Sequence, residues 1–209
     1  MPWEQFFNKG MCAVLFACGC RNILTTERIG LMRIGLVSDT HVPETGPEIP
    51  PQVYAAFEGV DMIFHAGDMH VNDVLDWLET VAPTIGARGN GDYPTPWNPN
   101  RPGLSEDPRV KDSHVVRVGH VSVGLIHGFP LPEEVPWRTI DELFAMYFSQ
   151  AVDVVVCGDT HVARIDRYEN LLVVNPGSPT LPNQVSGLGT VGFLDIVGNQ
   201  ITPSILQLT

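Results

Sequence analysis

Seven side chains of types that bind metal ions lie directly after short apolar runs in this sequence. They are Asp39, His41, Asp68, Asn90, His127, Asp159 and His161. Carboxylates and imidazoles bind divalent transition metals, and an amide oxygen adds a neutral ligand. Seven ligands are too many for one ion with open positions, but they suit two ions that share a carboxylate. A single Asp or His at a strand end is as often a turn or cap residue, whereas the ordered set predicts a dinuclear metal centre.

The apolar runs before these residues are typical of buried strands. The runs occupy residues 33–38, 61–65, 84–88, 121–126 and 153–157. Ligands in open α/β sheets bind beyond the carboxyl ends of strands, so we expect these ends to converge. The segment from Asp39 to His41 is expected to be extended, which would place its two ligands on one side.

The remaining periodicity predicts helices and hairpins. Helices are expected over 51–59, over 72–81 and from Thr139, where a capping box with Glu142 opens a helix to about Gln150. Hairpins are expected over 115–126, 163–175 and 191–208. The first half alternates strand and helix, while the second half is mostly antiparallel. We therefore expect the two halves to form the two sheets of an α/β (α+β) fold, a four-layer αββα sandwich of two mixed β-sheets flanked by helices.

The composition limits the partners. The chain has 209 residues, 44% of them hydrophobic and 17% charged, which suits one folded domain. Twelve basic residues stand against 24 acidic ones, for a formal net charge of −12. A groove that binds nucleic acid needs clustered Lys and Arg, so a nucleic-acid polymer is not expected as partner. If the substrate is a phosphate, metal ions must supply most of the positive charge.

The first 31 residues differ from the rest of the chain. Three of the four cysteines lie there, beside an apolar run from Met11 to Cys18 that is too short to span a membrane. We interpret residues 1–31 as a disordered leader or an over-extended reading frame, with an export or anchor signal as the alternative. Residues 32–209 form the expected single domain. Its one cysteine, Cys157, predicts a cytoplasmic protein without a disulfide framework.

With these motifs, residues 32–209 resemble the calcineurin-like metallophosphoesterase superfamily, and within it the YfcE-type phosphodiesterases. The resemblance implies the αββα fold and two divalent metal ions. It assigns Asp39, His41, Asp68 and His161 to the first ion, and Asp68, Asn90, His127 and Asp159 to the second, with Asp68 bridging. It also matches the turn from Asn175 to Ser178. The implied reaction is hydrolysis of a small phosphodiester by a metal-bridging hydroxide, with Asp68, Asn90 and Asp92 in catalytic roles.

The sequence departs from the family pattern at two positions. Asp159 stands where a His usually binds the second ion. This adds a negative charge, which weakens phosphate attraction and favours Mn or Mg over Zn, with Ni and Fe left open. Gly91 stands where larger relatives carry a His that protonates the leaving group. Asp92 remains beside it, more as an orienter than as an acid, so substrates with good leaving groups should react best.

Several alternatives remain open at this point. A scaffold or binding protein on the same fold, like the retromer subunit with a degraded site, needs no intact ligand set. A phosphomonoesterase or nucleotide pyrophosphatase would use the same site on another substrate. A homodimer is suggested by family analogy alone. The proline-rich loop 94–108 should bear on the choice of substrate. Trp97 and Trp137 are expected to pack their loops down, or else to stack on an aryl group.

Overall fold

The computed structural model describes residues 30–209. The predicted leader lies outside the described residues except for its last two, and strand β1 already begins at Leu31. None of the described helices has the length and apolarity needed to cross a membrane.

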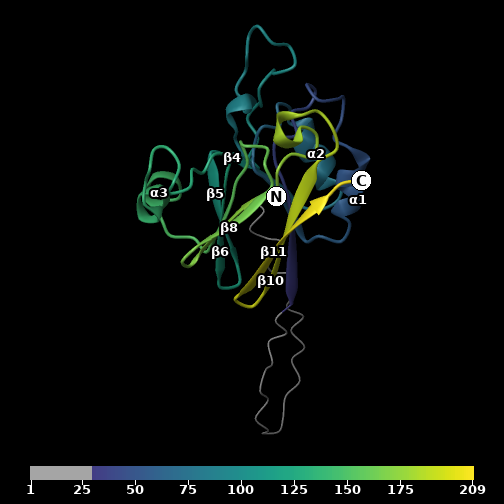
Figure 1. The fold of residues 1–209 in the computed structure, drawn as a ribbon. Helices are drawn as coiled ribbons and strands as arrows, with labels where there is room; N and C mark the ends of the chain where they lie inside the picture. Colours follow the sequence, from purple (N-terminus) through teal and green to yellow (C-terminus); the bar gives the residue numbers. More distant parts are fainter. Residues whose placement is uncertain (1–29) are drawn as a thin grey trace, which may run out of the picture.

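The larger sheet has six strands in the order β11-β10-β1-β2-β3-β4 (Figure 1). Its strands are β1 (Leu31–Val37), β2 (Met62–His65), β3 (Thr84–Ala87), β4 (Val110–Lys111), β10 (Thr190–Val197) and β11 (Gln200–Gln207). Strands β1 to β4 pair in parallel, and the hairpin of β10 and β11 is antiparallel to β1. The parallel part arises from the predicted alternation of strands and helices.

The smaller sheet has five strands in the order β5-β6-β7-β9-β8. Its strands are β5 (Ser113–Val118), β6 (Val121–Ile126), β7 (Val154–Val156), β8 (Arg164–Tyr168) and β9 (Leu171–Asn175). The β5–β6 and β8–β9 pairs are the predicted hairpins. Strand β7 lies parallel to both β6 and β9, so its carboxyl end points the same way as that of β6.

Three helices cover the outer faces of the sheets. Helices α1 (Pro51–Ala56) and α2 (Asp73–Glu79) pack on the larger sheet, and α3 (Ile140–Tyr147) packs on the smaller one. The predicted capping box opens α3: the Glu142 amide donates to Thr139 Oγ1, and the Thr139 amide donates to the Glu142 carboxylate. Two short 3-10 turns, η2 (Asn90–Asp92) and η3 (Pro182–Gln184), were not predicted.

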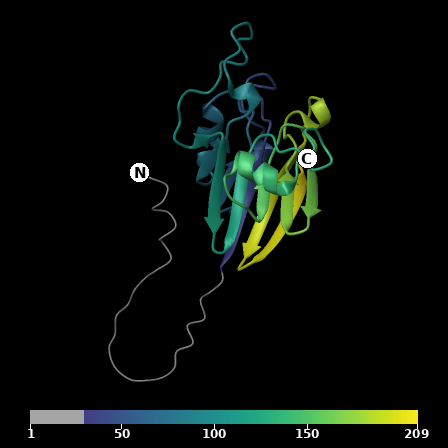
Figure 2. The same ribbon diagram turned by 90° about the vertical axis from the view of Figure 1, so that its left-hand side faces the viewer.

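The apolar residues divide into three layers. A central cluster that includes Ile34, Phe64 and Val123 joins the two sheets. A second cluster packs α1 and α2 on the larger sheet, and a third packs α3 on the smaller sheet. The edge-on view in Figure 2 shows the two sheets face to face. The four-layer αββα sandwich is therefore confirmed.

The structure corrects the assignment of each half of the chain to one sheet. The hairpin of β10 and β11 belongs to the sheet built by the first half, because β10 pairs with β1. The other edge of β1 is taken by β2, so β1 would otherwise present unpaired backbone groups along the centre of the molecule. Local patterns predict a hairpin but not the strand beside which it lies.

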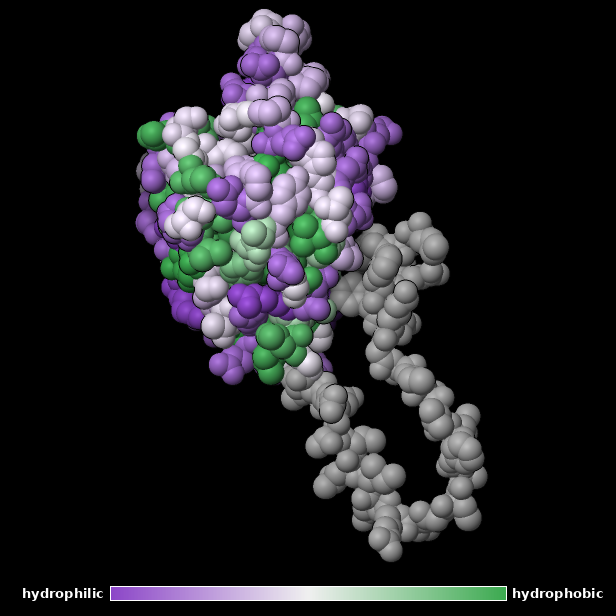
Figure 3. All heavy atoms as spheres, turned by 90° about the vertical axis from the view of Figure 1, so that its right-hand side faces the viewer, coloured by the Kyte–Doolittle hydropathy of each residue, from purple (hydrophilic) through white to green (hydrophobic). Residues whose placement is uncertain are grey.

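The segment between η2 and β4 projects from the body, as Figures 1 and 3 show. Trp97 at this projection is 86% exposed, and Trp137 on another loop is 70% exposed. The expectation that these side chains pack their loops down is therefore wrong. Prolines stiffen these loops without tryptophan packing, which leaves both indoles free at the surface.

Candidate metal centre

The candidate ligands lie on loops that leave the carboxyl ends of β1, β2, β3, β6 and β7. Backbone hydrogen bonds tie neighbouring loops together within each sheet, and the Asp159 amide, which donates to the Asp39 carboxylate at 3.1 Å, joins the two sheets. The Asp39 amide donates to the Gly67 carbonyl at 2.9 Å, and the Gly158 amide donates to the His127 carbonyl at 2.8 Å. The structure thereby brings the ligand side chains of both sheets to one place, where distances between neighbouring ligand atoms run from 3.0 to 3.9 Å.

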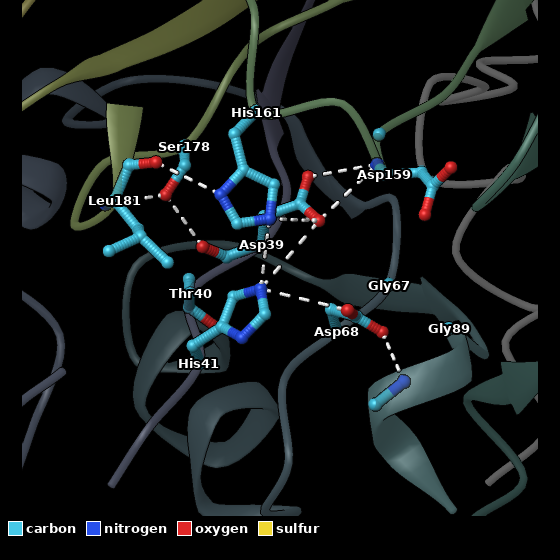
Figure 4. Close-up of polar contacts among 12 residues, drawn as sticks. Asp39, Thr40, His41, Gly67, Asp68, Gly89, Asp159, His161, Ser178 and Leu181 are labelled. Atoms are coloured by element: carbon cyan, nitrogen blue, oxygen red, sulfur yellow. Dashed lines mark hydrogen bonds and ion pairs between the residues drawn. The ribbon is translucent and has the colours of Figure 1, made fainter. Parts of the chain in front are cut away.

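Four of the side chains form a buried half of the centre, shown in Figure 4. Asp39, His41, Asp68 and His161 are each at most 5% exposed. The Nε2 atoms of His41 and His161 face each other at 3.2 Å. Asp39 Oδ1 lies 3.5 Å from His161 Nε2, and Asp68 Oδ2 lies 3.6 Å from His41 Nε2. Two imidazoles and two carboxylates thus converge on one point.

Asp68 divides its two oxygens between two groups of ligands. Oδ2 faces His41, while Oδ1 lies 3.4 Å from Nε2 of His127. Oδ1 also accepts a hydrogen bond from the Gly91 amide at 2.7 Å. With two ions bound, a carboxylate in this position would offer one oxygen to each, as a bridging ligand does.

The remaining side chains form an open half. His127 is buried, whereas Asn90 is exposed and the Asp159 side chain is 54% exposed. His127 Nε2 lies 3.0 Å from Asn90 Oδ1 and 3.5 Å from Asp159 Oδ1. Burial alone would lower the pKa of His127, but the hydrogen bond to Asp159 and the charges of Asp39 and Asp68 raise it to about 9. The oxygens of Asp68, Asn90 and Asp159 that surround His127 Nε2 therefore favour a positive charge at this place.

Backbone carbonyls orient two of the imidazoles. His161 Nδ1 lies 2.9 Å from the Leu181 carbonyl, and His127 Nδ1 lies 2.8 Å from the Ala66 carbonyl. A carbonyl only accepts, so we assign the proton to Nδ1 in both rings. The Nε2 atom of each ring faces the centre, where a bound metal ion would take the place of any Nε2 proton, as in metal-binding histidines held by an outer hydrogen bond.

The ligand loops hold a strained backbone conformation. Asp39, His41, Asp68, Asp159 and His161 have φ angles between 49° and 72°. The expectation that Asp39 and His41 lie on an extended segment is therefore wrong. Left-handed backbone costs a side-chain-bearing residue roughly 1 kcal/mol or more, and such residues gather at functional sites. The left-handed residues turn the chain tightly. Both side chains of each Asp-x-His pair therefore lie at the centre, Asp39 with His41 and Asp159 with His161.

Asp92 supports the loops from below. Its carboxylate is fully buried and accepts hydrogen bonds from the backbone amides of Asp68, Met69, His70 and Gly89. These partners leave the carboxylate no access to a substrate, which favours the orienting role over the acid role. Burial raises the pKa of Asp92, against the effect of these amide donors.

Glycines allow the loops to approach so closely. A Cβ atom at Gly89 would collide with Asp68, and one at Gly158 would collide with Ser38 and Asp39. The turn after β9 adds further support: Asn175 Nδ2 donates to the Gly158 carbonyl, and Ser178 Oγ donates to the Asp39 carbonyl, each at 2.7 Å. The matched turn thus braces a ligand loop from each sheet.

Glu44 and Arg101 were not singled out from the sequence. Glu44 Oε2 lies 3.8 Å from Nδ1 of His41 and 3.9 Å from Nδ1 of His70, and it accepts from the Arg101 guanidinium at 2.9 Å. Arg101 belongs to the projecting loop, so this pair connects that loop to the buried half. Nothing in the sequence distinguishes Glu44 from other acidic residues, because its partners His70 and Arg101 are distant along the chain.

The donors present fit divalent metal ions. Ligand atoms of Asp39, His41 and His161 lie within 4.8 Å of one another, and so do those of Asp39, Asp68 and His127. The Nε2 atoms of His41 and His161 lie 3.2 Å apart, and carboxylate oxygens lie beside them. A divalent cation satisfies such a donor set.

Comparison with known proteins agrees with this geometry. A family model described as the calcineurin-like phosphoesterase superfamily domain matches residues 32–199. The chain belongs to this superfamily. The resemblance carried by the ligand motifs is thereby confirmed, and the kind of enzyme indicated is a metal-dependent phosphoesterase.

Two archaeal members of the superfamily are similar over most of the chain. A probable metallophosphoesterase of Methanothermobacter thermautotrophicus is 36% identical over 84% of this chain and 92% of its own length. One of Methanocaldococcus jannaschii is 32% identical over 73% of this chain and 71% of its own. Among solved structures, Vps29 of Chaetomium thermophilum aligns with a TM-score of 0.63 at 22% identity, over 85% of this chain and 86% of that chain. This likeness shows the shared fold.

Proposed function

We propose that this chain is a two-metal phosphodiesterase that hydrolyses a small phosphodiester. The observation that carries the proposal is the divided carboxylate of Asp68, whose two oxygens face His41 and His127. Divalent ions, when bound, supply a nucleophile at neutral pH and neutralise charge on the phosphate. The protein's part is to fix the ligand positions through Asp92, the carbonyls behind His127 and His161, and the close-packed loops.

The charges around the centre support a diester over a monoester. The guanidinium of Arg101 is paired with Glu44, and that of Arg164 with Glu134 and Asp166. Asp159 adds a carboxylate where the family usually has a neutral His. A diester carries one negative charge and a monoester up to two, so the diester needs less positive charge from the site.

The proposal extends to the metal and the location. Oxygen ligands from Asp39, Asp68, Asn90 and Asp159 outnumber the imidazoles, and this favours Mn or Mg over Zn. We propose Mn as the native metal. We also propose a cytoplasmic location, because residues 32–209 contain a single cysteine, Cys157, and thus no disulfide framework.

A binding protein is the second candidate. Val135 and Trp137 are 69% and 70% exposed on one loop beside the open half, and exposed apolar groups of this kind often meet a partner. The intact ligand set favours the enzyme, because a binding surface does not require seven converging metal-ligand side chains.

The test uses the full chain, stripped with a chelator and reloaded singly with Mn, Mg, Ni or Zn. Hydrolysis of bis-p-nitrophenyl phosphate is compared with that of p-nitrophenyl phosphate. We expect metal-dependent turnover of the diester, abolished in Asp68→Asn and retained in the matched control Glu58→Gln, whose side chain is exposed after α1. Folded, metal-loaded protein without turnover would contradict the enzyme and favour the binding protein.

A further inference from the structure

A cavity of about 380 Å³ opens beside the open half of the metal centre. It lies between the loop that follows β6 and the loop that follows β7. Its lining includes Gly128, which directly follows His127, and the segment from Gly158 to Thr160, which contains Asp159. Two of the three loops that carry open-half ligands, those of His127 and Asp159, therefore also form one end of this cavity. A substrate held at the open half has direct access to it.

One side of the cavity is apolar and already packed. Phe129, Leu131, Tyr147 and Val173 line it, and all of them belong to or pack against the cluster between α3 and the smaller sheet. The rings of Phe129 and Tyr147 lie 5.9 Å apart between centroids. These contacts fix the walls before any ligand arrives, and the volume falls within the usual range for small-molecule sites, roughly 300–1,000 Å³.

The charges in the cavity discourage a second anion. Arg164 is the basic residue of the lining, and its guanidinium is 3.2 Å from Glu134 and 2.6 Å from Asp166. Glu134 also accepts from the Leu131 amide at 2.8 Å, which holds its carboxylate at the wall. Asp159 adds a further negative charge at the inner end. A diphosphate tail would therefore meet carboxylates, whereas an uncharged group would meet apolar side chains.

We infer that this cavity binds an uncharged aromatic ester group of the substrate, while the phosphate lies over the metal ligands. The inference rests on the proposed phosphodiesterase function and narrows its substrates to diesters with an aryl or nucleoside-like group. Flat rings suit the aromatic walls, since ring pairs gain about 0.5–1.5 kcal/mol beyond the area they bury. Metal centre and cavity then recognise different parts of one substrate.

The first test measures binding without any leaving group. Phenylphosphonate and methylphosphonate are titrated calorimetrically into the full, Mn-loaded chain. The phosphonate group is the same in both, so the difference reports the cavity whichever ester group departs in catalysis. We expect phenylphosphonate to bind at least tenfold more tightly, as expected for burying one ring. Equal affinities would overturn the inference.

The second test fills the cavity from its wall. An ideal Cβ at Gly128 meets no atom within 4 Å, and the backbone there is not left-handed, so Gly128→Phe has room to enter the cavity. Gly128→Ala is the matched small change. We expect Gly128→Phe to reduce the phenyl preference to within about threefold and Gly128→Ala to keep most of it. A preference that survives Gly128→Phe in folded protein would also overturn the inference.

Diester kinetics separate this inference from the proposed function. Methyl p-nitrophenyl phosphate and phenyl p-nitrophenyl phosphate share a leaving group and differ in the retained group. Hydrolysis of both with equal KM, together with equal phosphonate affinities, would contradict the cavity but leave the phosphodiesterase standing. Absence of hydrolysis with a clear phenylphosphonate preference would contradict the phosphodiesterase and leave the aromatic site.

Discussion

The two halves of the metal centre differ in how much protein surrounds them. In the buried half every ligand is at most 5% exposed, while in the open half the Asp159 side chain is 54% exposed and Asn90 faces solvent. Asp68 is the only one of the seven ligands that contacts imidazoles of both halves within 3.6 Å. The buried half is built to keep its geometry, and the open half is built to admit a substrate.

The same contrast explains where the sequence departs from its family. The substituted position, Asp159, lies in the open half, where water screens an added carboxylate. The buried half, where an uncompensated charge would cost most, keeps the full pattern of Asp39, His41, Asp68 and His161. Among the seven expected ligands, the departure from the family pattern thus lies at an exposed side chain, whereas the other departure, Gly91, lies outside this set and is buried.

The largest expected difference is between two variants that each neutralise one carboxylate, one in the buried half and one in the open half. Asp39→Asn removes a charge from a fully buried group that faces two imidazoles, and we expect kcat/KM on the diester to fall roughly a thousandfold. Asp159→Asn, where water can replace the lost ligand, should cost only about tenfold. Activity and metal content after dialysis are measured together. Equal losses in the two variants would remove the distinction between the halves.

The support beneath both halves is tested by Asp92→Asn. An amide cannot accept from four backbone N–H groups and places its own donors against some of them. We expect a loss of roughly 2–4 kcal/mol in the free energy of unfolding, and metal binding weaker by about 10–100-fold. Urea denaturation and calorimetric Mn titration measure these effects. Asp112→Asn, at an exposed site, is the control, and a similar loss there would show that the effect is not specific to Asp92.

Asp159→His tests the open half by removing its negative charge while keeping a metal-ligand side chain there. A neutral ligand in place of a carboxylate leaves the loaded centre with one more positive charge. We expect phosphate to be attracted more strongly, so that KM for the diester falls about tenfold, while the buried half keeps its metal affinity. Steady-state kinetics at saturating Mn measure the change. An unchanged or higher KM would mean that charge in the open half does not govern substrate attraction.

Acid should loosen the buried half through His65. This imidazole accepts from the Gly67 amide and lies 3.1 Å from the Thr40 hydroxyl between two ligands. Burial lowers its pKa from 6.5 to about 3. Below pH 6.5 the imidazole therefore binds a proton in the unfolded chain but not in the folded chain. The free energy of unfolding should fall as the pH is lowered from 6.5 towards 3.

A variant makes the contribution of His65 measurable. His65→Gln should cost about 1–3 kcal/mol at pH 7.5 through lost hydrogen bonds. Below pH 6.5 the gap to the wild type should narrow by up to about 1.4 kcal/mol per pH unit. Urea denaturation of chelated protein at several pH values gives the gap. His120→Gln, at an exposed histidine, should show no narrowing. A constant gap for His65→Gln would contradict the buried neutral state.

Local patterns determined most of the elements. The predicted strands, the three helices and the hairpins are present, with ends shifted by a few residues, because apolar periodicity, the Thr139 cap and the hairpin turns act over short distances. The short strand β4 was missed, since two residues after a proline-rich loop carry no periodic signal. The sheet that β10 and β11 join was also missed, because it depends on which edge of β1 is free.

The sequence alone determined the superfamily and its candidate ligands: an ordered set of metal-ligand types at strand ends. Only the tertiary structure decided how those ligands are shared and supported. The left-handed loops, the divided carboxylate of Asp68, the amides around Asp92 and the cavity beside Asp159 all join segments distant along the chain. The types and spacing of residues along the chain indicate which ligands are available. The distances between these ligands and their burial depend on how the two sheets pack.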